Sequence, residues 1–154
     1  MTAEIGKPAP AFTLKDQAGN DVSLSDFAGT SAVALVFYPF TFTGVCEGEL
    51  CQLRDDYSEF ETAGVQVLAV SCDSRHAQRI WAEKQGYNFP VLSDFWPHGA
   101  VAQAYGVFND ALGCAIRATF FIDKNGVLVD EFRTDALSTP REAARYREAF
   151  AKLA

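Results

Sequence analysis

The sequence lacks an apolar run of about 18 residues, the length that a membrane-spanning helix requires. Its first residues, MTAEIGKPAPAFTL, contain no basic stretch followed by an apolar one, so a secretory signal is not expected. Basic residues are scarce, because 13 Lys and Arg stand against 20 Asp and Glu, for a net charge of -7. Nucleic acids and anionic membranes both bind basic surfaces, so neither is expected as a partner.

Cysteines are few and irregularly spaced, at positions 46, 51, 72 and 114. Four cysteines with this spacing do not form the disulfide framework of a small secreted domain. No C-x-x-C pair is present, which argues against a zinc ribbon and against a thioredoxin-type disulfide reductase. We therefore expect free thiols in the cytoplasm and no metal site.

The sequence contains enough apolar residues to form one hydrophobic core. Residues 1–154 have the length of a single domain, and 49% of them are apolar. There is no internal repeat, linker or low-complexity segment. Residues 12–14 and 22–24 flank a turn-rich stretch and predict an N-terminal β-hairpin. The apolar runs 32–38 and 65–70 predict central strands that are buried on both faces.

Helical periodicity alternates with these strands. Leu50, Leu53, Tyr57 and Phe60 form one apolar stripe and predict a helix over residues 46–63. Ser74 predicts the start of a helix that runs to about Gln85, with Ile80 and Trp81 facing inward. The remaining predicted elements are a strand at 90–92, a helix at 100–105, a hairpin of 118–122 with 127–132, and a final helix opened by a capping box at Thr139–Glu142. The sequence thus predicts an α/β fold with a mixed sheet covered by helices on both faces.

The informative position is Cys46, which lies where a buried strand has just ended and a helix begins. A thiol there meets free backbone N–H groups and the positive end of the helix dipole, and both favour the thiolate. Only the thiolate attacks an electrophile. Thr43 lies three residues earlier, so one helical turn can bring its hydroxyl close to the sulfur. An isolated cysteine is more often a small buried apolar side chain. The strand-end position and the Thr43 spacing together favour a reactive thiol.

The stretch Pro39-x-x-x-Thr43-x-x-Cys46 resembles the active-site pattern of the peroxiredoxin family, P-x-x-x-T/S-x-x-C. The resemblance extends over the chain, from the Gly-x-x-Ala-Pro-x-Phe opening at residues 6–12 to Arg117 just before the apolar segment 118–122. Within the family, residues 93–100 and 103–109 resemble the alkyl hydroperoxide reductase E type of mycothiol-using bacteria. This resemblance implies a thioredoxin-like fold, a hydroperoxide substrate and a homodimer.

The resemblance also assigns roles to individual residues. Cys46 would be the peroxidatic nucleophile, Thr43 would hold the thiolate and the peroxide, and Pro39 would shield the sulfur from water. Arg117 would supply a fixed positive charge, since a guanidinium does not lose its proton in proteins. Glu49 resembles the residue that orients this arginine, although a solvated helix carboxylate is the alternative interpretation. No metal, flavin or nicotinamide cofactor is needed for this chemistry.

The identity of the thiol that completes the cycle stays open. Peroxide would convert Cys46 to a sulfenic acid, and a second thiol must then condense with it. Cys51 is one candidate. Residues five apart in an ideal helix are roughly 8–9 Å apart, beyond the ~7 Å reach of a disulfide. Gly44 and Gly48 would make the necessary unwinding easier.

An external thiol or redoxin, of the mycothiol, mycoredoxin or thioredoxin kind, is the other candidate, and the subfamily resemblance slightly favours it. Cys72 and Cys114 are expected to be core thiols, and Phe95 and Trp96 to form a pocket wall or a dimer contact. A thioredoxin-fold binding or chaperone module without peroxidase activity is the competing hypothesis. It leaves the combination of Thr43, Cys46 and Arg117 unexplained.

Overall fold

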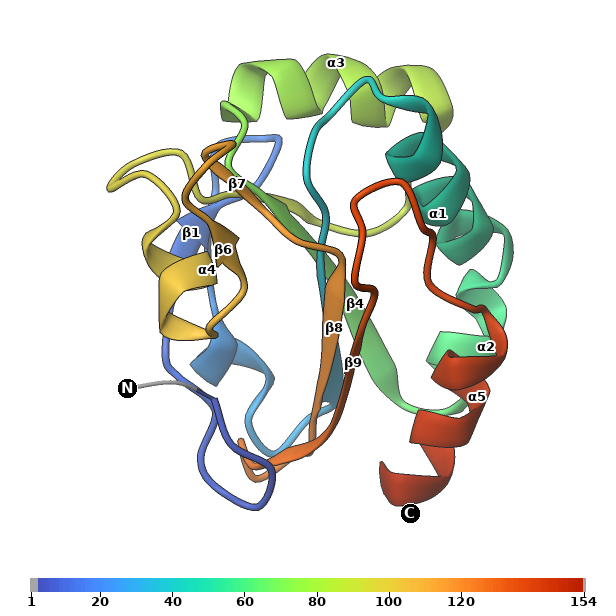
Figure 1. The fold of residues 1–154 in the computed structure, drawn as a ribbon. Helices are drawn as coiled ribbons and strands as arrows, with labels where there is room; N and C mark the ends of the chain where they lie inside the picture. The colour runs from blue at the N-terminus through green and yellow to red at the C-terminus, as the bar shows by residue number, and fades with distance from the viewer. Residues whose placement is uncertain (1–2, 154) are drawn as a thin grey trace.

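A computed structural model describes residues 3–153, which form a mixed α/β structure around one large sheet (Figure 1). The seven strands of that sheet lie in the order β2-β1-β5-β4-β3-β8-β9. They are β1 (Thr13–Lys15), β2 (Asp21–Ser23), β3 (Ala32–Phe37), β4 (Val65–Ser71), β5 (Val91–Ser93), β8 (Ala118–Ile122) and β9 (Leu128–Arg133). A small second sheet pairs β6 (Phe108–Asn109) with β7 (Cys114–Ala115).

The helices cover both faces of the large sheet. They are α1 (Gly44–Asp55), α2 (Tyr57–Thr62), α3 (Arg75–Gln85), α4 (Ala100–Ala104) and α5 (Ala144–Phe150), with short 3-10 helices at Leu24–Phe27 and Ala151–Leu153. Figure 1 shows α1, α2 and α5 on one side of the sheet, α4 on the other, and α3 across one end. No helix in the described part of the chain is both long enough and apolar enough to cross a membrane.

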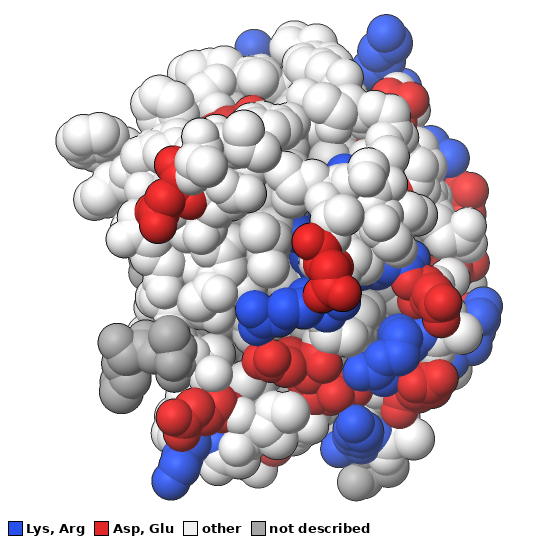
Figure 2. All heavy atoms as spheres, in the orientation of Figure 1, with Lys and Arg blue, Asp and Glu red and all other residues white. Residues whose placement is uncertain are grey.

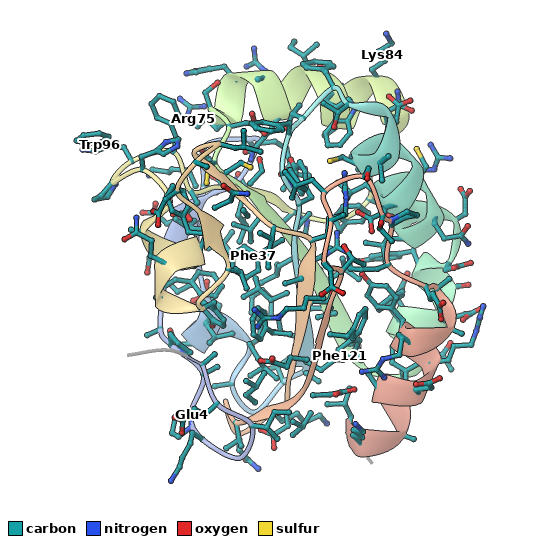
Figure 3. The ribbon with its side chains drawn as sticks, in the orientation of Figure 1. Glu4, Phe37, Arg75, Lys84, Trp96 and Phe121 are labelled. Atoms are coloured by element: carbon teal, nitrogen blue, oxygen red, sulfur yellow. The ribbon has the colours of Figure 1, made fainter. Side chains whose placement is uncertain are left out.

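The central strand β3 organises the core. All six of its residues are buried, and it pairs in parallel with β4 and antiparallel with β8. Because side chains alternate along a strand, Ala34 and Val36 face the side of α1 and α5, whereas Leu35 and Phe37 face the side of α4. In Figure 3, Phe37 and Phe121 mark these two cores. The predicted fold class, the N-terminal hairpin and the buried central strands are confirmed.

Three local predictions are wrong. The helix expected over residues 46–63 is interrupted at Asp56, whose backbone leaves the helical region, so that α1 and α2 are separate. Ile80 does not face inward, because 50% of its surface is exposed. Trp81 does face inward, as predicted, and Gln78 takes the place expected for Ile80, where its amide donates to Ser71 Oγ and to the Leu92 carbonyl, both at 2.9 Å. Ile80 lies two residues from Gln78, about 200° around the helix and on the opposite face.

The third error concerns the capping box predicted at Thr139–Glu142. The final helix begins only at Ala144, after an irregular segment. Arg141 explains the difference, because its backbone N–H donates to Glu49 and its guanidinium enters the core beneath β3 and β8. Tertiary hydrogen bonds of a buried arginine therefore outweigh the local preference for a helix start.

Candidate active site

The loop between β3 and α1 is fixed from several sides. Pro39 is buried, and the Thr41 N–H donates to the Asp73 carboxylate at 2.8 Å. Tyr38 Oη and Thr41 Oγ1 are 3.0 Å apart within the same loop. Phe42 has φ of 66°, a left-handed conformation that side chains with a Cβ rarely adopt. Such a backbone persists only where its surroundings hold it, and here it delivers the chain into the first turn of α1.

Cys46 lies in that first turn and has no exposed surface. The first hydrogen bond of the helix runs from the Glu47 N–H to the Thr43 carbonyl at 2.9 Å. The N–H groups before Glu47 therefore have no acceptor within the helix and remain available to an anion. The predicted position of Cys46 at a helix start is confirmed.

Arg117 contacts the sulfur directly. Its Nη1 donates to Cys46 Sγ at 3.2 Å and to Glu49 Oε1 at 2.6 Å, and its Nε donates to the Leu137 carbonyl at 2.6 Å. The Arg117 side chain is only 4% exposed, so it is not a surface residue. Where water is excluded, a fixed positive charge stabilises a neighbouring thiolate far more than the same charge does in water.

Glu49 joins this arginine to a second one, Arg141, which is not among the site residues predicted from the sequence. Glu49 Oε1 accepts from Arg141 Nη2 at 2.9 Å, and Oε2 accepts from Arg141 Nε at 2.9 Å and from its backbone N–H at 2.7 Å. Burial alone would raise the pKa of Glu49, but the hydrogen bonds and charges of Arg141 and Arg117 lower it below its ordinary value. Glu49 is thus an ionised, buried carboxylate and not a solvated one.

Arg141 also holds the strands beside the site. Its Nη1 donates to the carbonyls of Phe37 and Ala118, at 2.6 and 2.9 Å, and to Thr119 Oγ1 at 3.2 Å. Its side chain is 1% exposed. No local motif marks this residue, because it lies in an irregular segment and is defined only by long-range contacts.

Thr43 takes a different partner from the one expected. Its side chain is exposed, and its hydroxyl donates to the Phe40 carbonyl at 2.7 Å. The structure gives it no hydrogen bond to Cys46. With its proton engaged on Phe40, the Thr43 oxygen presents lone pairs, so it can accept a hydrogen bond from a ligand that reaches the start of α1.

The other three cysteines lack the arginine contact of Cys46. Cys51 is half-buried on the α3 side of α1, where its thiol donates to Gln85 Oε1 at 3.6 Å and lies 3.8 Å from Tyr87 Oη. Burial raises the pKa of Cys72 to about 12 and also raises the pKa of Cys114. Both are buried thiols, in line with the role expected for them.

Known proteins are similar to this chain in both sequence and architecture. The AhpC/TSA family pattern matches residues 5–131. Alkyl hydroperoxide reductase E of Mycobacterium tuberculosis is 51% identical over 124 residues, which cover 80% of this chain and 81% of that protein. Peroxiredoxin-2 of Rattus norvegicus is 40% identical over 136 residues, covering 82% and 67% of the two chains.

Solved structures of such proteins have the same fold. Peroxidoxin BcpB of Mycobacterium tuberculosis superposes with a TM-score of 0.84 at 30% identity, over 98% of this chain and 96% of that one. AhpC of Enterococcus faecalis superposes with a TM-score of 0.87 at 28% identity, over 98% and 92%. The chain therefore belongs to the AhpC/TSA family and has its thioredoxin-like fold. It is a peroxiredoxin, an enzyme that reduces peroxides at the expense of thiols.

Proposed function

We propose that this peroxiredoxin reduces hydrogen peroxide and organic hydroperoxides with Cys46 as the peroxidatic nucleophile. The observation that carries the assignment is the 3.2 Å contact of Arg117 Nη1 with Cys46 Sγ at the start of α1. Among the four cysteines, this is the one whose sulfur accepts from a guanidinium. The chaperone hypothesis does not account for this contact.

The reaction follows from the groups around the sulfur. The Cys46 thiolate attacks the terminal peroxide oxygen, an S–O bond forms as the O–O bond breaks, and the leaving alkoxide or hydroxide takes up a proton. Thr43 Oγ1 accepts a hydrogen bond from the peroxide, because its own proton is held by the Phe40 carbonyl. Arg117 stabilises the thiolate and then the negative charge on the departing oxygen. Glu49 and Arg141 hold Arg117 in place, while the buried Pro39 keeps bulk water from the sulfur.

The sulfenic acid is then reduced by an external thiol or redoxin, of the mycothiol, mycoredoxin or thioredoxin kind. Two observations support this choice over Cys51. The similarity to alkyl hydroperoxide reductase E is high, and Cys51 faces α3 instead of Cys46. The four cysteines are free thiols, as a reducing compartment would keep them, so we place the enzyme in the cytoplasm.

We further propose that two copies associate through the sparsely charged face that carries Trp96. Trp96, Phe95 and Leu112 are 81%, 52% and 56% exposed, and the His98 ring joins their loops by approaching the carbonyls of Phe95 and Gly113. Figure 3 shows Trp96 extending away from the body of the molecule, and Figure 2 shows few charges around this region. Exposed aromatic side chains of this kind mark protein interfaces. Sedimentation of Trp96→Ser should show monomers at concentrations where the unmodified chain is dimeric.

The assignment of Cys46 is tested by substitution of single cysteines. Cys46→Ser should abolish peroxide consumption with any thiol reductant while leaving the fold intact by circular dichroism. Cys72→Ser is the matched control, because it removes a buried thiol that lacks the arginine contact and should keep turnover. Substantial turnover by Cys46→Ser would refute the assignment, and a chaperone module would consume no peroxide in either form.

A further inference from the structure

The carboxylate of Glu47, next to the catalytic cysteine, ties the first turn of α1 to α3. Its Oε1 accepts from Trp81 Nε1 at 3.3 Å and from Gln85 Nε2 at 2.8 Å. Trp81 has no exposed surface and packs on Tyr38 and Tyr87, with ring centroids 5.4 and 5.2 Å apart. Glu47 touches none of the reacting groups, so the peroxide step does not account for these contacts.

Gln85 extends the connection to Cys51. Its amide nitrogen donates to Glu47, its amide oxygen accepts from the Cys51 thiol at 3.6 Å, and its backbone carbonyl accepts from Arg54 Nη1 at 2.6 Å. One residue of α3 therefore holds α1 before, at and after Cys51. We call the contacts among Glu47, Trp81, Gln85 and Cys51 the α1–α3 latch.

The two cysteines of α1 cannot meet while this helix is intact. Five residues of helix rotate a side chain by about 500°, which leaves Cys46 and Cys51 some 140° apart around the axis. Cys46 accordingly faces Arg117, and Cys51 faces Gln85. A disulfide between them requires the turns from Gly44 to Cys51 to unwind. Unwinding would pull Glu47 from α3 and leave the Trp81 indole N–H buried without its acceptor, which is unfavourable.

We propose that the α1–α3 latch, through Glu47, keeps α1 wound after peroxide has reacted and thereby prevents Cys51 from resolving the Cys46 sulfenic acid. Glu47 is in this sense a positioning residue for the second half of the cycle. The proposal rests on the peroxidase function proposed above. It adds a structural reason why the sulfenic acid is left for an external thiol.

If the α1–α3 latch opens, Cys51 can react with the Cys46 sulfenic acid. The Cys51 thiolate attacks the Cys46 sulfenic sulfur, an S–S bond forms, and the S–O bond breaks. The departing hydroxide leaves as water with the proton from the Cys51 thiol. Cys46 sulfur is reduced and Cys51 sulfur is oxidised, so no further oxidant or reductant is consumed.

The test compares variants that open the latch from either helix. Glu47→Ala removes the acceptor, and Gln85→Leu removes one donor without changing the charge beside Cys46. Glu47→Gln keeps an acceptor oxygen for Trp81, and Glu61→Ala is the control, since it removes an exposed carboxylate of α2. Each protein receives one equivalent of hydrogen peroxide. Intact mass then separates sulfenic acid from disulfide over time, and amide exchange of residues 44–52 is recorded on the reduced protein.

We expect sulfenic acid to persist in the unmodified protein and in Glu61→Ala. In Glu47→Ala and Gln85→Leu, the Cys46–Cys51 disulfide should form at least about tenfold faster, which corresponds to ~1.4 kcal/mol. Amide exchange should rise in the same two variants, while Glu47→Gln should remain near the unmodified protein. A purely structural role would give no such rescue and would not shift the ratio of disulfide to sulfenic acid.

Two results would overturn the proposal. One is an equal rate of disulfide formation in all five proteins, and the other is no Cys46–Cys51 disulfide in any of them. A failure of the peroxidase function looks different, because Cys46 would then stay reduced in every variant. Amide exchange on the reduced proteins reports on the latch even in that case.

Discussion

Replacing Glu49 by glutamine isolates the charge that holds the two arginines of the site. The side chains of Glu49, Arg117 and Arg141 are only 7%, 4% and 1% exposed. Removing one partner of a buried ion pair costs about 3–5 kcal/mol, because the remaining charge stays buried without compensation. Glutamine keeps an oxygen acceptor, so Glu49→Gln should lie near the lower limit, at about 3 kcal/mol. That is a large part of the ~5–15 kcal/mol that stabilises a typical domain.

Urea unfolding at neutral pH measures this loss. With a slope near 2 kcal/mol per molar, the midpoint should fall by roughly 1.5 M. Glu59→Gln is the control, because Glu59 pairs with Arg147 at the surface and should contribute little.

The same substitution has a pH signature. The folded pKa of Glu49 lies below its ordinary value of 4.5, so its stabilising contribution is complete above that value. It is lost as the pH falls through the folded pKa, where the carboxylate takes up a proton. The stability gap between the unmodified protein and Glu49→Gln should therefore close on acidification below about 4.5. A gap under ~1 kcal/mol at neutral pH, or one that widens in acid, would refute this account of the ion network.

Three further substitutions test neighbouring parts of the site. Arg117→Ala should slow peroxide reduction in stopped-flow more than tenfold, over ~1.4 kcal/mol, and an unchanged rate would leave the helix terminus as the sole activator. Thr43→Val keeps the side-chain shape but removes the hydroxyl proposed to accept from the peroxide, so the same rate should fall about tenfold, while loss of the exposed hydrogen bond to the Phe40 carbonyl should lower stability by only ~1 kcal/mol. Gly48→Ala should raise the stability of the protein by up to ~1 kcal/mol, because its helical backbone has open space for a Cβ; destabilisation would show hidden crowding.

The sequence predicted the features that depend on residues close together in the chain. Unbroken apolar runs predicted the buried strands β3 and β4, and Ser74 predicted the start of α3, where its hydroxyl accepts from the Ala77 N–H at 3.3 Å. The position of Cys46 followed from the same reasoning, since a strand that ends just before a helix exposes the backbone N–H groups of that helix. Arg117 was recognised through the family pattern, and the structure supplies its 3.2 Å contact with the sulfur.

Long-range polar contacts were not predictable in this way. Arg141 stands within a sequence that satisfies the rules for a helix start, and only the folded chain shows that Glu49 and three strand-side acceptors hold it elsewhere. The misplacement of Ile80 has a similar origin, because the buried amide of Gln78 fixes the rotation of α3. Polar groups that are buried and satisfied leave no periodic pattern in the sequence.

The distance along the chain between Cys46 and its arginines has a consequence for biosynthesis. Arg117 follows Cys46 by 71 residues, and Arg141 follows Glu49 by 92. Since the N-terminal part of a protein leaves the ribosome first, the thiol emerges long before the charges that stabilise its anion. A nascent chain that ends before residue 117 contains neither arginine, so no guanidinium can contact the Cys46 sulfur in it. The contact of Arg117 with the sulfur, and its support through Glu49 by Arg141, can therefore form only near the end of synthesis.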